Sequence, residues 1–529
     1  MNKYISSHNL WFWLAFLAGF FVITLPYIGF NFEWLPGDLG DTRFNLFILE
    51  HGKQFLSGEV ASFWSANFMY PEPEIISLSD NLLGAMPIYA FFRWIGFGLF
   101  SAFQLWVVVL TLLNYWASYK LSSFLIKDYK IAVITAFIFT FSLSLTSQMN
   151  HVQMLPRFAF PFALLFLFKW FENFNSRDFG LALLLFVYQF YCGIYLGFMS
   201  FLPFIIVLGI GVYHYRKNIL LRLKKVRELL RYVSLTAINF VFLILLFLPY
   251  LRRAKDGQLN TYEQIYESIP TGLSYLSVSP SSWLYGSTNE IVTNYTAFWD
   301  HWISPGFLTI LSFIIIIVLL IVHYGLNKKT LIKKLPINLK WTLIAGVVTF
   351  IVFLRIDNYS LYYFLQKLPG FGAMRSITRI VNVELLFFGL ATGVLLVKLL
   401  SRWIKYPFLI MSLSIGFLLV ENYCIPSKVL RVSKAEMQNR HNQLREKMKH
   451  LEEGTIISYE PEELEKSIET YQIDAMLAAQ SLHLKSINGY SGTAPIDFHH
   501  YWTNPNKKSL EIWLKRFPEV DIKDVERIY

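Results

Sequence analysis

Long apolar runs recur along this 529-residue chain and constrain its fold more than any other feature. The runs are about 17–25 residues long, enough for a helix to cross a hydrocarbon core of about 30 Å. They lack the short, alternating pattern of β-barrel strands. The chain is 55% hydrophobic and only 16% charged, which is outside the usual range of soluble globular proteins. We therefore predict an all-α polytopic membrane protein.

About eleven of the runs are predicted to be transmembrane helices, with ends placed where polar residues begin. Another apolar segment, 82–97, is interrupted by Pro87, Arg93 and several glycines. We expect it to lie at the membrane interface or to re-enter the membrane. The predicted spans cover approximately residues 10–30, 100–119, 131–148, 157–171, 178–192, 194–213, 232–250, 305–323, 340–355, 380–399 and 406–424.

Lysine and arginine are concentrated in alternate connections between these spans. When the spans are counted alternately, five basic connections fall on one side, and the densest of them is 214–231. The positive-inside rule places this side and the N-terminus in the cytoplasm. The predicted location is the inner (cytoplasmic) membrane of a bacterium, with the lipid bilayer as a partner. Because topology explains much of the net charge of +11, no nucleic-acid partner is predicted.

The long polar segments fall on the opposite, extracytoplasmic side. They comprise the loops 31–81, 252–304 and 356–379 and the tail 430–529. The tail has a charged helical pattern followed by a short strand and turn residues, and a segment of about 100 residues can hold one small domain. We predict a membrane domain over 1–429 and a small extracytoplasmic α/β domain over 430–529.

The first outer loop begins with a dense group of candidate catalytic residues. Asp38, Asp41 and Arg43 lie just after the first apolar run, where a site can reach both a lipid headgroup and water. A carboxylate beside a guanidinium stays ionised and can act as a general base or bind a metal. The alternative is structural, with Asp38 as the N-cap of an interfacial helix and Arg43 as its surface ion-pair partner.

Cationic residues mark two further places on the outer side. His151 and Arg157 lie between two spans, where they can hold a sugar or a phosphate or, alternatively, rest among lipid headgroups. Arg375 and Arg379 are four residues apart, so a helix starting there would place both on one face. Together with Arg355 they would form a cationic cup for a lipid phosphate. The alternative is snorkelling to anionic headgroups.

The segment Gly40-Asp41-Thr42-Arg43-Phe44 resembles a motif of the GT-C superfamily of polytopic glycosyltransferases. The aminoarabinose and protein O-mannosyl branches of that superfamily carry Asp-Glu-x-Arg-Tyr near the start of a large first outer loop. Gly40 stands where those branches have the first acid, so the catalytic position falls to Asp41 or Asp38, and Asp41 is favoured. Residues 79–84 and 488–495 resemble further segments of uncharacterised bacterial GT-C-like membrane proteins.

This resemblance implies an enzyme that moves a sugar from a polyprenyl-phosphate-linked donor to a glycan, lipid or protein acceptor. Asp41 or Asp38 would deprotonate the acceptor hydroxyl. A Mg²⁺ or Mn²⁺ ion held by loop carboxylates is left open, because some GT-C branches work without a metal. The residues expected to bind the substrate or the lipid phosphate are Arg43, Asp80, His151, Arg157, Arg375 and Arg379.

Two other classes of protein share parts of this pattern. A transporter or flippase of a lipid-linked sugar would use the same cationic cup without making a bond, and charges buried within the spans would favour it. Arg93 and Glu384 are the candidates for such charges. A non-catalytic envelope assembly factor would keep its function after loss of both Asp38 and Asp41.

Overall fold

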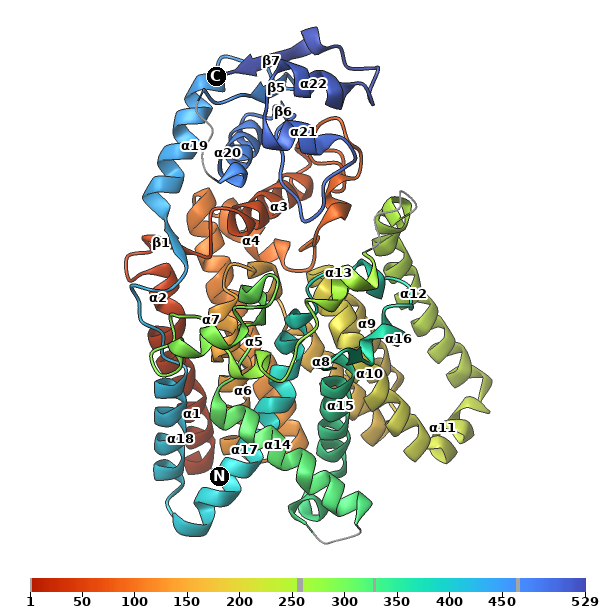
Figure 1. Cartoon of the computed structure of the whole chain (residues 1–529). Helices are drawn as coiled ribbons and strands as arrows, with labels where there is room; N and C mark the ends of the chain where they lie inside the picture. Colours follow the sequence, from red (N-terminus) through yellow and green to blue (C-terminus); the bar gives the residue numbers. More distant parts are fainter. Residues whose placement is uncertain (1, 255–259, 327–329, 463–466) are drawn as a thin grey trace.

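The structure is a computed structural model that describes residues 2–254, 260–326, 330–462 and 467–529. It is mostly helical, as predicted, with a long bundle of helices that carries the tail at one end (Figure 1). The predicted outer loop 252–304 includes residues 255–259, which lie outside the described residues.

Every predicted span coincides with a helical segment. In the part of the chain that the structure describes, eight segments are long and apolar enough to cross a membrane. Three further predicted spans are shorter helices: α9 (Ser176–Cys192), α15 (Ile337–Phe353) and α18 (Pro407–Glu421). The eight longer segments are Asn9–Ile28, Leu99–Ile126, Tyr129–Ser147, Val152–Asn173, Ile194–His214, Val226–Ala254, Phe307–Gly325 and Ile377–Trp403.

These segments contain most of the helices labelled in Figure 1. The segment Asn9–Ile28 begins within α1 (Asn2–Gly19) and continues through a π-helical turn into α2 (Leu25–Ile28). The segment Tyr129–Ser147 comprises α6 (Tyr129–Phe141) and α7 (Leu143–Ser147). The remaining helices of the bundle are α5 (Leu99–Ile126), α8 (Ala159–Asn173), α10 (Ile194–His214), α11 (Arg216–Leu223), α12 (Val226–Ala254), α14 (Phe307–Leu320) and α17 (Val381–Trp403).

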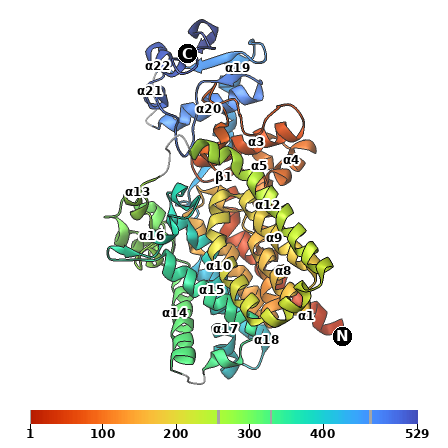
Figure 2. The ribbon, with the colours of Figure 1, turned by 90° about the vertical axis from the view of Figure 1, so that its right-hand side faces the viewer.

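Helices α6 and α17 form the centre of the bundle. Glycines of α17 allow the close approach, because a Cβ at Gly389 would lie 2.9 Å from the carbonyl oxygen of Thr135. Small residues at such contacts let helix backbones pack tightly in membranes. By contrast, α12 is mostly exposed and carries apolar side chains along its outer face. Its ribbon lies on the outside of the bundle, at the right of Figure 1 and facing the viewer in Figure 2.

The apolar segment 82–97 does not span the bundle. Its helix α4 (Met86–Trp94) has nine residues, which gives a length of about 14 Å. It packs on α3 (Asp41–Leu56), where Glu50 accepts hydrogen bonds from Arg93 Nε at 2.8 Å and the Tyr89 hydroxyl at 2.7 Å. Together α3 and α4 cover one end of the bundle, beneath the tail (Figure 1).

The tail contains a parallel three-stranded sheet, flanked by helices, in the order β6-β5-β7. Its base is joined to the first loop by an antiparallel pair in which β1 (Trp34–Pro36) aligns with β4 (Arg431–Ser433). First-loop, α5 and tail side chains also share one apolar core. The other tail elements are α19 (Lys434–Met448), β5 (Ile456–Tyr459), α20 (Ile468–Ser481), β6 (Lys485–Ser486), α21 (Phe498–Thr503), α22 (Lys507–Leu514) and β7 (Val525–Ile528).

The elements on the third outer loop are short. A short antiparallel hairpin pairs two strands of two residues each, β2 (Arg355–Ile356) and β3 (Tyr359–Ser360). The helix α16 (Tyr362–Leu365) follows, and the second outer loop carries α13 (Tyr262–Tyr266). These elements lie at the same end of the bundle as α3, while α11 and the link from α17 to α18 lie toward the other end (Figure 1).

Candidate functional site

A cavity of about 410 Å³ lies where the first loop, the tail and the outer ends of the helices meet. Its polar lining comes from segments that are far apart in the sequence, including four of the predicted site residues. The polar and charged residues of the lining are Asp41, Asn45, Ser77, Ser79, Asp80, Gln153, Tyr195, Tyr250, Asn260, Arg375, Ser376, Arg379, Tyr490, Ser491 and Thr493.

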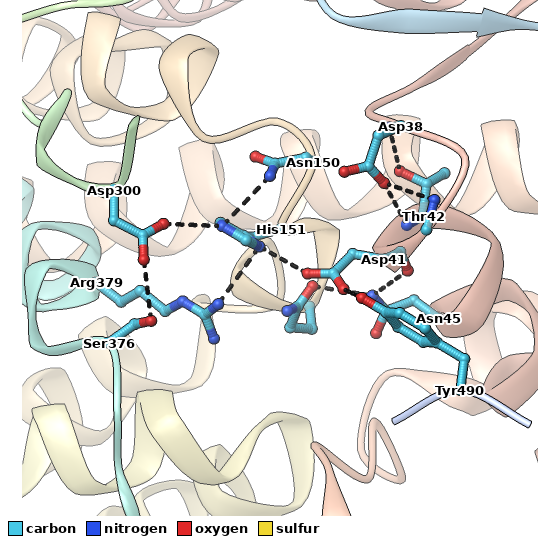
Figure 3. Close-up of polar contacts among 12 residues, drawn as sticks. Asp38, Asp41, Thr42, Asn45, Asn150, His151, Asp300, Ser376, Arg379 and Tyr490 are labelled. Carbon is cyan, nitrogen blue, oxygen red and sulfur yellow. Dashed lines mark hydrogen bonds and ion pairs between the residues drawn. The ribbon is translucent and has the colours of Figure 1, made fainter. Parts of the chain in front are cut away.

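Asp41 is the first residue of α3, and both of its carboxylate oxygens are engaged (Figure 3). The Tyr490 hydroxyl donates to Oδ1 at 2.6 Å, and His151 Nδ1 lies 2.9 Å from Oδ2. Burial acts to raise the pKa of Asp41, but hydrogen bonding and charge from His151, the Tyr490 hydroxyl and the charge of Arg379 hold it well below its usual range. Asp41 is therefore ionised at any physiological pH.

His151 lies behind Asp41, outside the cavity lining, and its side chain is 10% exposed. Its Nε2 is 3.4 Å from Oδ1 of Asp300, and Asp300 in turn accepts a hydrogen bond from Ser376 at 3.2 Å. Burial and the charge of Arg379 act to lower the pKa of His151, but Asp300 and Asp41 raise it above its ordinary value. The ring is thus favoured in its charged form.

Arg375 and Arg379 both line the cavity, although no single helix carries them as predicted. Arg375 precedes the 3₁₀ turn Ile377–Ile380, which contains Arg379. The Arg379 guanidinium stacks 4.9 Å from the centre of the Tyr195 ring. Among the described atoms, its buried Nε has no hydrogen-bond partner. A buried N–H without a partner is costly, so an anionic ligand is favoured here.

Asp80 forms another acidic part of the cavity wall. Its Oδ1 accepts hydrogen bonds from the backbone N–H groups of Ile194, at 2.6 Å, and Tyr195, at 3.4 Å, where α10 begins. Burial raises the pKa of Asp80 to about 6, even though the charge of Arg379 acts in the opposite direction. Asp80 therefore changes its charge near neutral pH.

Asp38 makes the contacts of a residue that stabilises a helix start. Its Oδ1 accepts hydrogen bonds from the backbone N–H groups of Gly40, at 3.1 Å, and Thr42, at 3.4 Å. Burial and the nearby charge of Asp41 raise the pKa of Asp38. Asp38 does not line the cavity. It lies two residues before the N-cap Gly40, so it supports the helix start without being the N-cap that the structural alternative expects.

Arg43 and Arg157 are fully buried and lie away from the cavity lining. Arg43 forms an ion pair with Asp474 and donates from Nη2 to the carbonyl oxygen of Thr470 at 2.9 Å, which ties α3 to the tail. Arg157 donates from Nη2 to the carbonyl oxygen of Phe139 at 2.9 Å, inside the bundle. In this arrangement both arginines hold structural elements together.

The third arginine of the predicted cationic cup lies elsewhere. Arg355 stacks 4.4 Å from the centre of the Tyr266 ring and donates to the carbonyl oxygen of Tyr266 at 2.9 Å. It is not among the residues that line the cavity. The cationic part of the cavity therefore consists of Arg375 and Arg379.

Two participants were not identified from the sequence as members of the site. Asp300 lies in an aromatic-rich loop and belongs to no recognisable motif. The only sequence feature that could have indicated a site is an aspartate next to a histidine, His301. Tyr490 belongs to the turn segment 488–495, which the structure brings against Asp41 with Ser491, Gly492 and Thr493 along the cavity. Their approach depends on the docking of distant segments.

The donor groups around Asp41 do not suit a divalent metal. Mg²⁺ and Mn²⁺ favour several oxygen ligands in near-octahedral geometry. His151 and Arg379 place positive charge beside Asp41, with Arg379 Nη2 3.4 Å from His151 Nδ1, and this charge would repel a cation. Over the described ranges, no group of three or more His, Cys, Asp or Glu side chains has the spacing of a metal site.

Comparison with known proteins gives a likeness of overall structure at low sequence identity. No family model matches the chain, and no curated protein matches it. A solved structure of the archaeal oligosaccharyltransferase AglB from Archaeoglobus fulgidus, bound to an inhibitory peptide and a dolichol-phosphate, is 13% identical with a TM-score of 0.47. A structure of the Archaeoglobus fulgidus oligosaccharyltransferase in complex with Zn and sulfate is 12% identical with a TM-score of 0.43.

Both likenesses cover 96% of this chain, and they cover 68% and 66% of the other chains. The chain thus spans about two thirds of the length of these structures. Both are oligosaccharyltransferases, membrane glycosyltransferases of the GT-C superfamily that the first loop resembles. Because both TM-scores are below 0.5, the function proposed for this chain rests on its own side chains.

Proposed function

We propose that the chain is a membrane glycosyltransferase that takes a sugar from a polyprenyl-phosphate-linked donor. The acceptor is a glycan, lipid or protein, and transfer takes place on the extracytoplasmic face of a bacterial inner membrane. The observation that carries the proposal is one cavity in which an ionised carboxylate, Asp41, and two guanidinium groups, Arg375 and Arg379, face the same space.

The position of the cavity supports a lipid-linked substrate. Its lining includes Tyr195 from α10, Tyr250 from α12 and Arg379 from the start of the α17 segment, all at one end of the bundle. Tyrosine rings offer apolar faces to a sugar or a lipid stem. The Arg379 side chain, with an unpartnered Nε among the described atoms, provides N–H donors for phosphate oxygens.

The proposed reaction is a displacement at the anomeric carbon of the donor sugar. The acceptor oxygen forms the new bond as the bond from the sugar to the phosphate oxygen breaks, and the electron pair leaves with the phosphate. Asp41 accepts the proton of the acceptor hydroxyl and then releases it to water. Its oxygens have free lone pairs for this hydroxyl, because a carboxylate has about four acceptor sites and the described contacts use two.

Arg375 and Arg379 are proposed to stabilise the negative charge that develops on the leaving phosphate. Fixed cations that face such a charge lower the barrier more than they favour the ground state. The tail contributes Tyr490 and the adjoining turn to the cavity wall, so its proposed role is to complete the acceptor side of the site.

The test is a transfer assay on the purified full chain in lipid, with a panel of polyprenyl-phosphate sugars. The variant is Asp41→Asn, which keeps the shape of the side chain and removes its charge. Because a general base contributes about 10²–10⁴ in rate, we expect transfer to fall by that factor. Full activity of Asp41→Asn would remove Asp41 from the reaction.

A matched control is Asp497→Asn. Asp497 is exposed and has a positive φ of 67°, a conformation that asparagine tolerates. Wild-type transfer by this variant would show that the loss in Asp41→Asn is local. Tight donor binding without transfer by the wild-type chain would instead favour a transporter, and a flipping assay with the same donor would then decide.

A further inference from the structure

His151 lies between two carboxylates that come from opposite sides of its ring (Figure 3). Nδ1 is 2.9 Å from Asp41 Oδ2, and Nε2 is 3.4 Å from Asp300 Oδ1. A neutral imidazole carries one N–H donor and one lone pair, whereas the imidazolium carries two donors. Two donor nitrogens also approach the ring, Asn150 Nδ2 at 3.4 Å from Nε2 and Arg379 Nη2 at 3.4 Å from Nδ1. The shortest contact of the ring is the one from Nδ1 to the Asp41 carboxylate. Because each ring nitrogen has a carboxylate oxygen beside it, the imidazolium satisfies both carboxylates at once.

The charges around the ring support the same protonation state. The charged groups within contact distance are Asp41 at the start of α3, Asp300 in the 3₁₀ turn Phe298–His301, and Arg379 in the 3₁₀ turn Ile377–Ile380. Two carboxylates and one guanidinium leave one negative charge uncompensated. An imidazolium at His151 makes this poorly exposed cluster neutral, which avoids the cost of an unpaired buried charge.

A divalent ion would compete with His151 for the same position. To bind Asp41 and Asp300 together, it would have to lie where the imidazole ring now lies, since the ring contacts both carboxylates. Beside the ring it would meet the positive charges of His151 and Arg379, whose Nδ1 and Nη2 atoms are 3.4 Å apart. Like charges at such distances repel strongly in a shielded site.

We propose that the imidazolium of His151 takes the place that a catalytic divalent cation would otherwise occupy beside Asp41. Transfer then proceeds without a bound metal, an inference that rests on the proposed glycosyltransferase function. The ring fixes one oxygen of Asp41 and balances its charge while the acceptor hydroxyl binds. His151 is thus a positioning residue, and Arg379, next to the same ring, remains the group that faces the donor phosphate.

The first experiment measures metal binding directly, with Mn²⁺ as the probe and electron paramagnetic resonance as the readout. The wild-type full chain in lipid nanodiscs is expected to bind no Mn²⁺ that depends on Asp41. Its transfer activity is expected to be unchanged after treatment with EDTA. Bound Mn²⁺ that is lost in Asp41→Asn would overturn the inference, as would activity that EDTA abolishes and Mn²⁺ restores.

A matched pair of variants tests the position of the cation. His151→Asp and His151→Gln both remove the imidazolium, but only the first adds a third carboxylate beside Asp41 and Asp300. Because three carboxylates can hold Mn²⁺, we expect His151→Asp to bind the ion and His151→Gln to bind it much more weakly. A folded His151→Asp that binds no Mn²⁺ would overturn the inference.

The Mn²⁺ measurement separates the two proposals. If the wild-type chain transfers no sugar from any donor, the proposed function fails, while the resonance signal still reports whether His151 excludes a metal. If His151→Asp does not fold, the comparison of wild-type and Asp41→Asn spectra decides alone.

Discussion

Two carboxylates on the wall of one cavity, Asp41 and Asp80, are both desolvated by the fold, yet their pKa values are shifted in opposite directions. Asp41 contacts the His151 ring and a tyrosine hydroxyl, and its pKa is held well below the usual range. Asp80 contacts two backbone N–H groups, and burial raises its pKa to about 6. Burial pushes both groups in the same direction, so the partners account for the difference.

The comparison shows how one cavity can contain a permanent charge and a variable one. The groups that lower the pKa of Asp41, namely His151, Arg379 and the Tyr490 hydroxyl, come from three separate segments and favour its charged form. The α10 backbone N–H groups that Asp80 contacts stabilise its charged form less, so the loss of hydration on burial has the larger effect on its pKa. A constant charge suits the acceptor side of the reaction, whereas a charge that changes near neutral pH affects how the cavity receives an anionic donor.

The largest change in donor affinity is expected from Arg379→Gln, because the charge of Arg379 acts on both carboxylates. Loss of a charged hydrogen bond to the donor phosphate costs about 2 kcal/mol, so the donor Kd should rise roughly thirtyfold. Isothermal titration with a polyprenyl-phosphate sugar measures this change. Arg252→Gln, at an exposed arginine paired with Glu74, is the control, and an equal Kd in both variants would contradict the assignment.

Tyr490→Phe tests one hydrogen bond that stabilises the charge of Asp41, without a direct effect on Asp80. The variant removes the hydroxyl that donates to Asp41 Oδ1 at 2.6 Å and leaves the ring in place. A hydrogen bond to a charged group contributes about 1.5–3 kcal/mol, so kcat should fall roughly tenfold or more. The donor Kd should stay near its wild-type value, since Tyr490 belongs to the proposed acceptor side. A change in Kd without a change in kcat would place Tyr490 with the donor instead.

Asp80→Asn tests the variable charge. Below about pH 6 Asp80 is protonated and neutral, and above that pH it is ionised and repels a donor phosphate near Arg379. The donor is therefore expected to bind a few-fold more tightly at low pH than at high pH. The charged groups that act on Asp80 are Arg379 and Asp41, with the neutral Tyr250 hydroxyl nearby.

In Asp80→Asn the donor Kd should lose this pH dependence. The amide oxygen can still accept hydrogen bonds from the backbone N–H groups of Ile194 and Tyr195, so the start of α10 should be preserved. Measurement of Kd across the pH range for both proteins decides the question. A wild-type Kd that is flat with pH would show that Asp80 lies too far from the donor.

Asp38→Ala is expected to have the smallest effect on transfer. It removes two hydrogen bonds to backbone N–H groups at the start of α3. Loss of a capping side chain costs about 1 kcal/mol of stability, measurable as a lower midpoint of thermal unfolding. Transfer should fall much less than in Asp41→Asn. A loss as large as that of Asp41→Asn would give Asp38 a direct role in catalysis.

The sequence predicted local and periodic features well. Long apolar runs become helices because a backbone in hydrocarbon must satisfy its own hydrogen bonds, and each predicted span is helical in the structure. Eight of these segments are long enough to cross a membrane, and α9, α15 and α18 are shorter, so the number eleven stays a prediction. The expected small α/β tail corresponds to a three-stranded parallel sheet with flanking helices.

Side-chain partners were predicted less well, since they depend on contacts between distant segments. Arg43, two residues from Asp41, forms an ion pair with Asp474 in the tail, more than four hundred residues away. The expected helix with Arg375 and Arg379 on one face is absent from the described residues, yet both side chains reach the cavity. The bends of a loop, which periodicity does not encode, decide this outcome.

By itself, the sequence determined that the chain is a helical membrane protein with polar loops, because apolar run length and charge are local properties. It also indicated Asp41 as a candidate. Only the tertiary structure decided that His151 and Tyr490 contact that carboxylate, that Asp300 lies on the other side of the His151 ring, and that Asp38 faces backbone amides. The charge of a buried group depends on atoms within a few ångströms of it, and the fold brings those atoms together from four separate parts of the chain.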